Sequence, residues 1–455
     1  MVGHEPDGEG LARAMDTDTI CAIATPAGAG GLGVIRVSGP HAGALAHAVL
    51  GRLPQPRFAT LARFRDEAGQ TLDEGIALYF PGPASFTGED VLELQGHGSP
   101  VVLDRLLRSL VALGARLARP GEFTERAFLN GKIDLVQAEA VADLVASANE
   151  ASARAAFRTL QGAFSETLEG LHQRLVVLRT HVEAAFDFPD ESLDTTADSA
   201  VGPALQTIRA LVAEALRRGR EGRLLREGAH VVIVGAPNAG KSTLLNALVG
   251  HEAAIVSPYP GTTRDLVRET VVLDGLALRL TDTAGLRDSD DPIEREGVRR
   301  AEGVLADADY ALWVVDDTEG ESSRVPPPTT IPTLIVYTKI DRSGRPAGPC
   351  PGGFAVSAPT AVGLAELRRG IRALILGPES RSCEEGAFTA RRRHVEALQY
   401  VATALAAAEA RQQEGQMELV AEELRRAHDR LGEITGRFTS DDLLGRIFAD
   451  FCIGK

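Results

Sequence analysis

Cysteine is rare in this chain, and no two cysteines have the spacing that a metal-binding or disulfide pattern requires. Cys21, Cys350, Cys383 and Cys452 lie far apart in the sequence, and no C-x-x-C pair occurs. Zinc-binding domains and disulfide-rich secreted domains both depend on closely spaced cysteines. We therefore expect four free thiols in a reducing compartment.

Long apolar runs are also missing. No stretch of about 18 uninterrupted apolar residues occurs, and a helix needs roughly that length to cross a bilayer. Residues 1–18 are acidic and lack the basic and apolar regions of a secretory signal. These absences predict a cytoplasmic protein with no membrane segment and with a loose N-terminal tail over 1–18.

Lysine is the scarcest charged residue. Of 48 basic residues only four are lysine, at positions Lys132, Lys241, Lys339 and Lys455. A chain that otherwise uses arginine keeps lysine where a compact ammonium is needed in place of a planar guanidinium. The four lysines are therefore candidate functional residues.

Positive charge as a whole is in deficit, because the formal net charge is −15. A chain with this charge repels polyanions such as nucleic acids. Any contact with nucleic acid must therefore use a local basic patch or the surface of a partner.

The 455 residues are enough for several domains, since single hydrophobic cores stop growing near about 250–300 residues. Over 19–131 the short apolar runs ICAIATP, GVIRVSG, GIALYFPG and DVLELQGHG alternate with Gly/Pro breaks and one helical piece near Pro100 to Leu113, which predicts an N-terminal α+β domain. Residues 132–227 and 377–455 have the 3.6-residue period of helices, and 228–376 alternate strand and helix signals. The expected fold is multidomain, with an α/β domain inserted into an all-helical domain.

The strongest motif opens the inserted domain. The run VVIVGAPNAGKSTLLNALVG contains a buried strand, the loop Gly235-x-x-x-x-Gly240-Lys241-Ser242 and an apolar helix. Such a loop directs backbone N–H groups at phosphates, while Lys241 neutralises phosphate oxygens and the Ser242 hydroxyl holds Mg²⁺. This predicts a P-loop nucleotide site. Its expected loop contacts are Asn238, Ala239, Gly240, Lys241, Ser242 and Thr243.

Two later segments are placed to sense the γ-phosphate. Gly261-Thr262-Thr263-Arg264-Asp265 lies where a switch loop is expected, and a threonine there can close over Mg²⁺. The strand LALRLTDTAG ends in Asp282-Thr283-Ala284-Gly285. This ending places a carboxylate near the metal and a glycine amide near the γ-phosphate.

A third segment selects the base. The strand TLIVYTKID ends in Thr338-Lys339-Ile340-Asp341, and Ser357-Ala358 follows the next strand. Asp341 can accept two hydrogen bonds from the guanine edge that adenine cannot supply, while the Lys339 stem covers the base. Four motifs in this order on successive strands predict a Ras-like GTPase domain.

The hydrolytic machinery differs from that of Ras. Leu286 stands after Gly285, where Ras-like enzymes carry the glutamine that orients the attacking water. Charge in the transition state must therefore be stabilised in another way. The alternatives are Arg287, a partner protein, or a monovalent cation near the β- and γ-phosphates, for which Asn238 is a candidate ligand.

Together these motifs identify a resemblance to the bacterial tRNA modification GTPases of the MnmE family, also called TrmE. The resemblance extends from about Asp18 to Lys455. It rests on ATPAGAGGLGVIRVSG, FTGEDVLELQGHG, RPGEFTERAFLNGKIDLVQAEA, DFPDE, GAPNAGKS, GTTRD, DTAGLRDSDDPIEREG and FTSDDLLGRIFADFCIGK.

The resemblance implies a homodimer that forms a heterotetramer with the FAD-binding protein MnmG. Together the two proteins would add an aminomethyl or carboxymethylaminomethyl group at the 5-position of the wobble uridine of certain tRNAs. A 5-formyl- or methylene-tetrahydrofolate, bound by the domain 19–131, would supply the one-carbon unit. Contact with tRNA would be made mainly by the partner.

The resemblance also implies ligands residue by residue. Potassium would drive dimerisation of the GTPase domains in place of an arginine finger, and its implied ligands are Asn238, Ser257, Tyr259 and Thr262. Magnesium would use Ser242 and Thr263, and Glu294 would organise the attacking water. The implied folate contacts are Arg36, Glu93, Lys132 and Lys455, which include the two lysines outside the nucleotide motifs.

Two positions depart from the family pattern. Thr338 stands where the family usually has asparagine, and Pro359 stands where a basic residue is common. Both departures predict modestly weaker nucleotide binding. The alternative function is a GTPase acting in ribosome assembly, which a C-terminal KH module with a G-x-x-G loop would favour. The C-terminal sequence here is Ala-rich and predicts helices instead.

Overall fold

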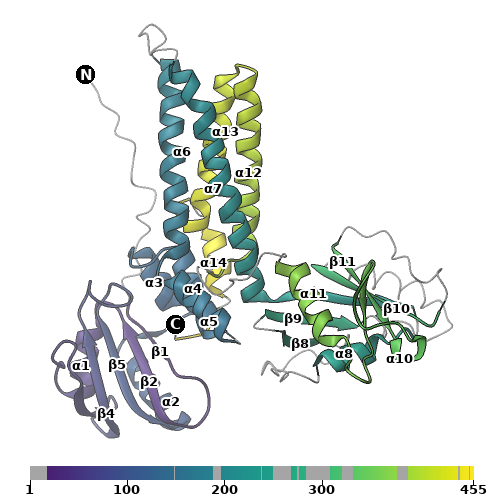
Figure 1. Ribbon diagram of the computed structural model, residues 1–455. Helices are drawn as coiled ribbons and strands as arrows, with labels where there is room; N and C mark the ends of the chain where they lie inside the picture. The colour runs from purple at the N-terminus through teal and green to yellow at the C-terminus, as the bar shows by residue number, and fades with distance from the viewer. Residues whose placement is uncertain are drawn as a thin grey trace, which may run out of the picture. The chain divides into compact units, whose positions relative to one another are not determined.

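Both ends of the chain contribute to one folded unit in the computed structural model (Figure 1). Residues 1–142 and 432–455 form the first unit, and residues 143–431 form the second. The structure describes residues 18–147, 149–187, 196–236, 238–249, 268–273, 276–282, 308–319, 331–376, 388–438, 441–449 and 451–454.

The first unit is built on a six-stranded sheet with the order β3-β4-β5-β2-β1-β6. Its strand pairs are antiparallel except for β1 and β6, which run parallel. The strands are β1 (Ile20–Ile23), β2 (Gly30–Ser38), β3 (Thr60–Arg65), β4 (Thr71–Phe80), β5 (Val91–Gly98) and β6 (Arg116–Leu117).

Two helices cover one face of this sheet. Helices α1 (Ala42–Leu50) and α2 (Pro100–Ala112) place Leu45 and Leu106 in the same buried cluster as Val37 and Leu94 of the sheet. The sequence predicted α2 and the strands around ICAI, GVIRVS, GIALYF and VLELQG. It did not predict α1 or β3, whose short apolar runs have no clear period.

Three further helices of this unit share a second apolar cluster. They are α3 (Glu122–Leu129), α4 (Leu135–Val145), whose last residues reach the second unit, and α14 (Asp441–Ala449). Leu135 and Ala138 of α4 pack against Ile447 and Phe448 of α14 and against Phe451 beyond it. The end of the chain is therefore part of the core of the first unit.

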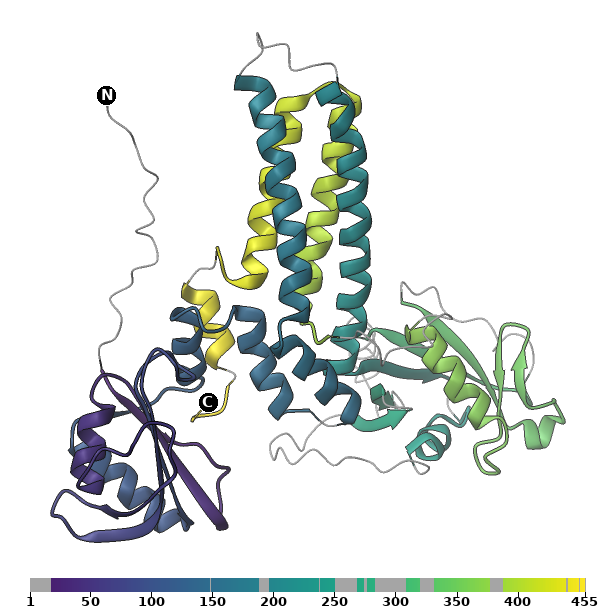
Figure 2. The ribbon, with the colours of Figure 1, turned by 60° about the vertical axis from the view of Figure 1, so that its left-hand side comes forward.

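The second unit contains a bundle of four long helices, which Figure 2 shows side by side. A shorter helix, α5 (Glu150–Leu160), precedes them and packs on α6 and α7. The four are α6 (Ala163–Asp187), α7 (Thr196–Glu227), α12 (Arg392–Gln413) and α13 (Met417–Thr435). Helix α6 ends at Asp187, the first residue of the DFPDE motif, and residues 188–195 lie outside the described ranges.

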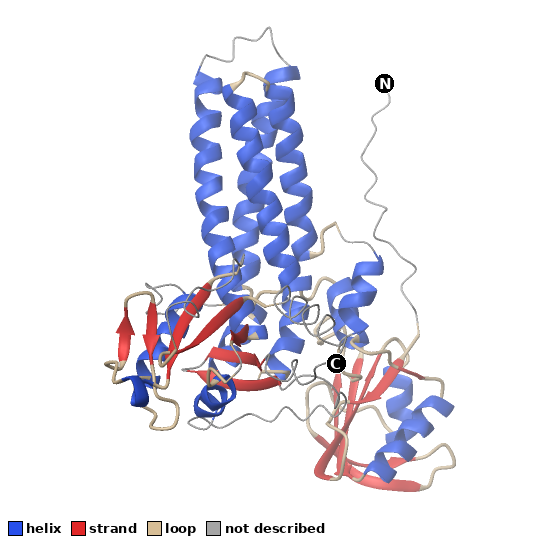
Figure 3. Cartoon of the chain, turned by 90° about the vertical axis from the view of Figure 1, so that its right-hand side faces the viewer, coloured by secondary structure: helices blue, strands red, loops and turns tan. Residues whose placement is uncertain are grey.

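An α/β segment interrupts this bundle between α7 and α12 (Figure 3). Its seven-stranded sheet has the order β12-β13-β11-β10-β7-β9-β8, with β8 and β12 antiparallel to their neighbours at the two edges. The strands are β7 (Ala229–Gly235), β8 (Arg268–Leu273), β9 (Leu276–Asp282), β10 (Tyr310–Asp316), β11 (Thr333–Thr338), β12 (Gly348–Cys350) and β13 (Gly353–Ala355).

The central strands of this sheet are buried on both faces, as parallel strands between layers are. Val231 and Ile233 of β7 pack against Leu244 of α8 (Lys241–Val249) and Leu367 of α11 (Leu364–Leu376). A single short helix, α10 (Ile340–Ser343), follows β11 directly. In the sequence, α7 precedes this segment and α12 follows it, and the two helices pack on each other. The sheet is therefore an insertion in the helical bundle.

Candidate functional site

Four parallel strands bring the predicted nucleotide motifs to one edge of the inserted sheet. Gly235 at the end of β7 lies opposite Val314 of β10, and Ile233 lies opposite Asp282 at the end of β9. Asp316 at the end of β10 lies opposite Thr338 at the end of β11. Ligands of open α/β sheets bind beyond the carboxyl ends of their strands, which is where these motifs meet.

The phosphate loop wraps around a buried ammonium. Lys241, the first residue of α8, is 7% exposed, and its Nζ donates to the carbonyl oxygens of Gly235 at 3.1 Å and Ala236 at 2.9 Å. Within the loop, Asn238 and Gly240 have φ values of 59° and 92°. These two hydrogen bonds hold the ammonium at the start of α8, where the N–H groups of a helix N-terminus favour an anion.

A buried hydroxyl joins the base-recognition strand to the phosphate loop. Thr338 is 2% exposed, and its Oγ1 donates to the carbonyl oxygen of Ala239 at 2.6 Å, with the carbonyl oxygen of Val315 at 3.1 Å. The side chain that replaces the family's asparagine therefore still anchors the loop after β11. Its effect on nucleotide affinity stays a prediction.

The residues predicted to bind guanine come together beyond β11. Asp341 lies in the first turn of α10, and one of its oxygens accepts a 2.8 Å hydrogen bond from the Ser357 hydroxyl. Ser357 is buried and Asp341 is exposed, so the hydrogen bond orients a carboxylate that solvent or a ligand can reach. Ala358 follows Ser357 in the same loop.

Lys339 is held by a carboxylate from the neighbouring strand. Its φ is 58°, and its Nζ lies 2.6 Å from Oδ2 of Asp316. Burial acts to raise the pKa of Asp316, but hydrogen bonds from Lys339 and Thr318 outweigh it and hold the pKa below its usual range. Asp316 therefore stays ionised and fixes the ammonium end of the Lys339 side chain.

Part of the predicted nucleotide site lies outside the described residues. This holds for both switch motifs and for the groups expected to organise hydrolysis. The residues concerned are Ser257, Tyr259, Gly261, Thr262, Thr263, Thr283, Ala284, Gly285, Arg287 and Glu294.

A second candidate site lies on the sheet of the first unit. Arg36 of β2 and Glu93 of β5 are cross-strand neighbours, and Nε and Nη2 of Arg36 lie 3.0 and 2.9 Å from the same Glu93 oxygen. The guanidinium also lies 5.9 Å from the ring centroid of Phe86 and 5.8 Å from that of Phe123. Two of the predicted folate contacts therefore form an ion pair flanked by aromatic rings.

The third predicted folate contact is held by the same loop that carries Phe86. Lys132 is exposed, and its Nζ donates to the carbonyl oxygen of Pro83 at 3.0 Å. Because Arg36 is already paired with Glu93, Lys132 is the predicted contact whose charge is available for an anionic group. The fourth contact, Lys455, lies outside the described residues.

The last described residues pack closely on the first strand. A Cβ added to Gly454 would lie 2.4 Å from the carbonyl oxygen of Ile23, and Gly454 has a φ of 93°. A side chain at this position is therefore excluded by both contact and backbone conformation. The N–H of Gly121 also donates to the carbonyl oxygen of Cys452 at 3.4 Å. These contacts fix the residue before Lys455 on the sheet of the first unit.

Sequence reasoning missed an ionic cluster behind this site. Arg126 of α3 is 6% exposed and pairs with Asp18, Glu89 and Glu122, and Arg116 pairs with Asp18 and Glu122. Burial acts to raise the pKa of Glu122, but hydrogen bonds from Arg116 and the Arg119 backbone lower it to about 2. The motifs FTGED and FTERA contain Glu89 and Arg126, but sequence spacing could not show that they meet.

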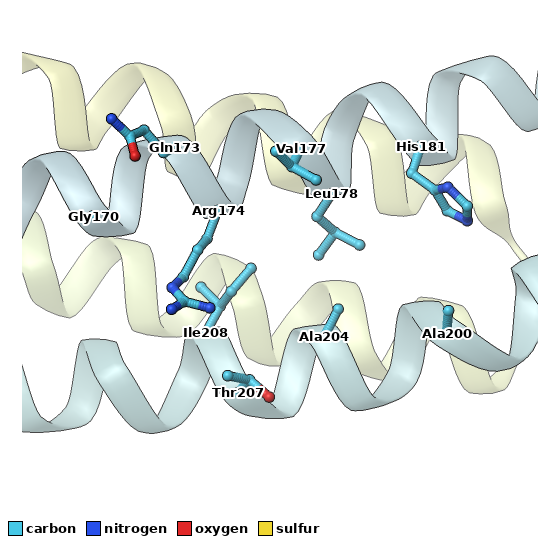
Figure 4. Close-up of a pocket in the computed structure, with 10 residues that line it drawn as sticks. All are labelled: Gly170, Gln173, Arg174, Val177, Leu178, His181, Ala200, Ala204, Thr207 and Ile208. Carbon is cyan, nitrogen blue, oxygen red and sulfur yellow. The ribbon is translucent and has the colours of Figure 1, made fainter.

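A groove of about 680 Å³ lies between α6 and α7. Figure 4 shows Arg174 and Leu178 of α6 facing Ala204 and Ile208 of α7 across it. Gln173, Val177, His181 and Thr207 are also among its lining residues. Among the described residues, none that was predicted to bind nucleotide or folate lines this groove.

The cysteines and the helices agree with the expectations from composition. Cys21, Cys350 and Cys452 are free thiols, and Cys383 lies outside the described ranges. In the part of the chain that the structure describes, no helix combines the length and apolarity needed to cross a membrane. Across the same residues, no group of three His, Cys, Asp or Glu side chains is placed to hold a metal ion.

Two family models match the chain over nearly its whole length. The model described as "GTP-binding protein TrmE N-terminus" matches residues 19–132, and the model described as "MnmE helical domain" matches residues 135–452. The second match alone covers more than half of the chain. It spans the inserted sheet as well as the bundle, which agrees with an insertion between α7 and α12.

The chain is similar to tRNA modification GTPases of bacteria over almost its whole length. The tRNA modification GTPase MnmE of Alkalilimnicola ehrlichii is 54% identical over 97% of this chain and 100% of its own length. That of Methylococcus capsulatus is 51% identical over the same shares. A GTP-binding protein of Sulfolobus solfataricus in complex with GDP matches 61% of this chain and 78% of its own, at 16% identity and a TM-score of 0.25. This score is too low to add to the fold described above, whereas the sequence relatives are decisive: the chain belongs to the MnmE family of tRNA modification GTPases.

Proposed function

We propose that this protein hydrolyses GTP as the switch component of an enzyme that modifies the wobble uridine of certain tRNAs. The GTPase proposal rests on the hydrogen bonds that connect the loop of Asp341 to the phosphate loop of Lys241. Ser357 orients the Asp341 carboxylate, and Thr338 ties the same loop to the phosphate loop through Ala239. Base selection and phosphate binding thus share one rigid edge of the sheet.

Magnesium fits the start of α8. Ser242 lies in the first turn of that helix beside the buried Lys241, so its hydroxyl is at the end of the helix that favours phosphate and its metal. Thr263 would supply the second protein ligand. When bound, the metal would neutralise charge on the β- and γ-phosphates.

Potassium is the proposed replacement for an arginine finger. Asn238 is exposed and has a positive φ in the phosphate loop, which turns it away from a helical path. It would hold the cation with Ser257, Tyr259 and Thr262. Glu294 would orient the attacking water, and Arg287 is the remaining candidate for stabilising charge.

Tetrahydrofolate is the proposed ligand of the first unit. Its pterin has a donor and acceptor edge that suits Glu93, and its glutamyl tail is anionic and suits Lys132. The rings of Phe86 and Phe123 beside Arg36 offer flat apolar contact. Lys455 would join the site from the chain end beyond Gly454. The one-carbon unit would be a formyl or methylene group.

A homodimer is proposed through the first unit. Leu61 of the edge strand β3 and Ile76 of β4 are cross-strand neighbours that are 67% and 41% exposed, and Phe58, two residues before β3, is 62% exposed. Exposed apolar residues near the edge of a sheet suit burial by another copy. The same proposal includes a heterotetramer with MnmG, mainly indirect contact with tRNA and a cytoplasmic location. The net charge of −15 agrees with indirect contact, because the chain as a whole repels nucleic acid.

The domain bounds are also part of the proposal. They are a tail over 1–18, a folate-binding dimerisation domain over 19–131, a GTPase domain over 228–376, and a helical domain formed by 132–227 and 377–455. The alternative role in ribosome assembly is not favoured, because the described residues from 388 onward form α12, α13 and α14 and include no strand of a KH module.

Four measurements test this proposal. Purified protein should bind GTP and GDP and leave ATP unbound at the same concentration. Hydrolysis should be faster in potassium than in sodium at equal ionic strength, and equal rates would remove the cation claim. Calorimetry with a reduced folate tests the first unit. Nucleoside analysis of tRNA from cells lacking the protein decides the modification claim, since unaltered wobble uridines would leave only the GTPase.

A further inference from the structure

We propose that Arg223, Asp309, His230 and Thr281 form a relay that transmits the state of the nucleotide site to helix α7 of the bundle. The inference rests on the proposed GTPase function and names the residues through which the inserted domain acts on the helical domain. All four residues belong to the second unit. Each successive pair is joined by a hydrogen bond or an ion pair.

The relay begins beside the nucleotide edge. Thr281 directly precedes Asp282, the last residue of β9, and is 1% exposed. The sheet register places Asp282 opposite Ile233 of β7, two residues before the phosphate loop begins at Gly235. A displacement of Asp282 that follows the bound nucleotide must therefore also displace Thr281.

His230 passes this displacement across the sheet. Its Nε2 lies 3.0 Å from the Thr281 hydroxyl, and it is partly buried on β7. Through its backbone, His230 also holds Asp309. The N–H of His230 donates to Oδ2 of Asp309 at 3.0 Å, and the N–H of Asp309 donates to the carbonyl oxygen of His230 at 2.9 Å.

Thr281 and Asp309 flank residues 282–308 in the sequence, which include the predicted DTAG switch motif. His230 bonds to both flanking residues, so it joins the two strands from which this segment starts and to which it returns. A residue with this position senses relative movement of β9 and β10, the two neighbours of β7 in the sheet.

Arg223 carries the signal into the bundle. It lies one turn before the end of α7, and its Nη2 is 2.8 Å from Oδ1 of Asp309. The Asp309 carboxylate thus uses one oxygen for the inserted sheet and the other for the helix. A guanidinium suits this link because its fork fixes direction as well as charge.

The connection between α7 and β7 leaves little slack. Gly228 alone separates the helix from the strand, with a φ of 73°, and its N–H donates to the carbonyl oxygen of Leu224 at 2.9 Å. A cavity of about 380 Å³ lies beside this turn, lined by Arg226 and Glu227 of α7 and Arg279 of β9 among others. The cavity leaves space for the end of α7 to move. The ion pair between Arg223 and Asp309 would make that movement follow the position of Asp309.

Hydrogen–deuterium exchange of the full-length protein tests the relay. Amide exchange over residues 214–227 is compared between the GDP state and GDP with aluminium fluoride, in potassium buffer. We expect a difference in the unmodified protein that Arg223→Gln and Thr281→Val each reduce at least twofold. GDP affinity should stay within about twofold in Arg223→Gln, because Arg223 lies on the bundle side of the relay.

Arg217→Gln is the matched control. Arg217 is on the same helix and pairs with Glu214 and Glu221 of that helix, so its loss should leave the nucleotide-dependent difference unchanged. The double variant of Arg223 and Thr281 sharpens the result. Two breaks in one relay should have no more effect than one, whereas independent sites would add.

Thermal unfolding of each variant checks that it is folded. If Arg223→Gln does not fold, Arg223→Lys takes its place, and we expect it to reduce the exchange difference only partly. Unchanged exchange differences in both single variants, with GTP hydrolysis intact, would overturn the relay and leave the GTPase standing. Additive effects in the double variant would also overturn it. Absence of GTP binding in the unmodified protein would instead overturn the proposed function.

Discussion

The two candidate sites hold their arginine and lysine side chains with different acceptors. In the first unit, arginines pair with carboxylates inside the protein, as Arg126 does with Glu89 and Glu122, and Arg36 does with Glu93. At the nucleotide edge, Lys339 also pairs with a carboxylate, that of Asp316, but Lys241 donates to carbonyl oxygens of its own loop. An arginine paired with a carboxylate is neutralised and serves structure, whereas an ammonium on neutral acceptors still attracts an anion. Two of the four lysines, Lys241 and Lys132, are bonded to backbone carbonyl oxygens in this way.

The largest effect is expected from breaking the buried cluster. Arg126→Met leaves Glu89, Glu122 and Asp18 with one fewer cation in a site where Glu122 is 1% exposed. Removal of one partner from a buried ionic group costs about 3–5 kcal/mol. Chemical denaturation of the full chain should show this loss in the first unit. Arg63→Met, which removes an exposed pair with Glu74, is the control and should cost less than about 1 kcal/mol.

Acid should weaken the same cluster. The pKa of Glu122 is about 2 in the folded protein against an ordinary value of 4.5. A lowered pKa means that its stabilisation is complete above pH 4.5 and is lost as the pH falls toward 2. Thermal unfolding at pH 5, 4 and 3 should show this decline, and Glu122→Gln should show a shallower one. An equal slope in both proteins would assign the decline to other carboxylates.

At the nucleotide edge, we expect GTP affinity to depend on the positive charge of Lys241 more than on the packing of its side chain. Lys241→Met keeps an unbranched side chain but removes the ammonium, so GTP affinity should fall roughly 100-fold, by analogy with loss of a charge-assisted contact. A fluorescent GTP analogue measures the change. Lys241→Arg should fail as well, since Lys241 is only 7% exposed and its Nζ bonds to two carbonyl oxygens that leave little room for a guanidinium. Restored binding in the arginine variant would contradict the distinction between the two cations.

Base selection should depend on one carboxylate. Asp341→Asn replaces an acceptor with a donor facing the guanine edge, and GTP affinity should fall about 10- to 100-fold. Xanthosine triphosphate carries a carbonyl where guanine has an amino group, so its affinity should rise in the same variant. Competition binding with both nucleotides measures the two changes. A parallel loss for both would show that the variant damages the loop and does not change its selectivity.

The smallest expected effect concerns the hydroxyl between the two loops. Thr338→Val leaves the carbonyl of Ala239 without its donor, and the lost hydrogen bond is worth about 1 kcal/mol, or roughly fivefold in GTP affinity. Thr338→Asn restores a donor and should recover part of the affinity. If valine binds GTP as well as threonine does, the two loops are positioned by packing alone.

Local sequence signals predicted the parts of this protein that are continuous in the chain. Strand β7, the loop before Lys241 and helix α8 follow one another directly, and the period of the long helices was visible in their Ala-rich sequence. Contacts between distant segments were not predictable in this way. Arg126 meets Asp18 across more than a hundred residues, and Thr338 meets Ala239 across 99. Neither sequence period nor motif spacing encodes such pairs, because the sheet topology alone decides which strand ends become neighbours.

The residues from 441 to 454 complete the core of the first unit, where Ile447, Phe448 and Phe451 cover Leu135 and Ala138. The 143–431 unit lies between these two parts of the first unit in the sequence, so a ribosome makes all of it before residue 441. Until then the apolar side chains of Leu135 and Ala138 lack the residues that cover them in the folded protein. A chain that stalls before residue 441 would keep this surface uncovered, even if the second unit had already folded.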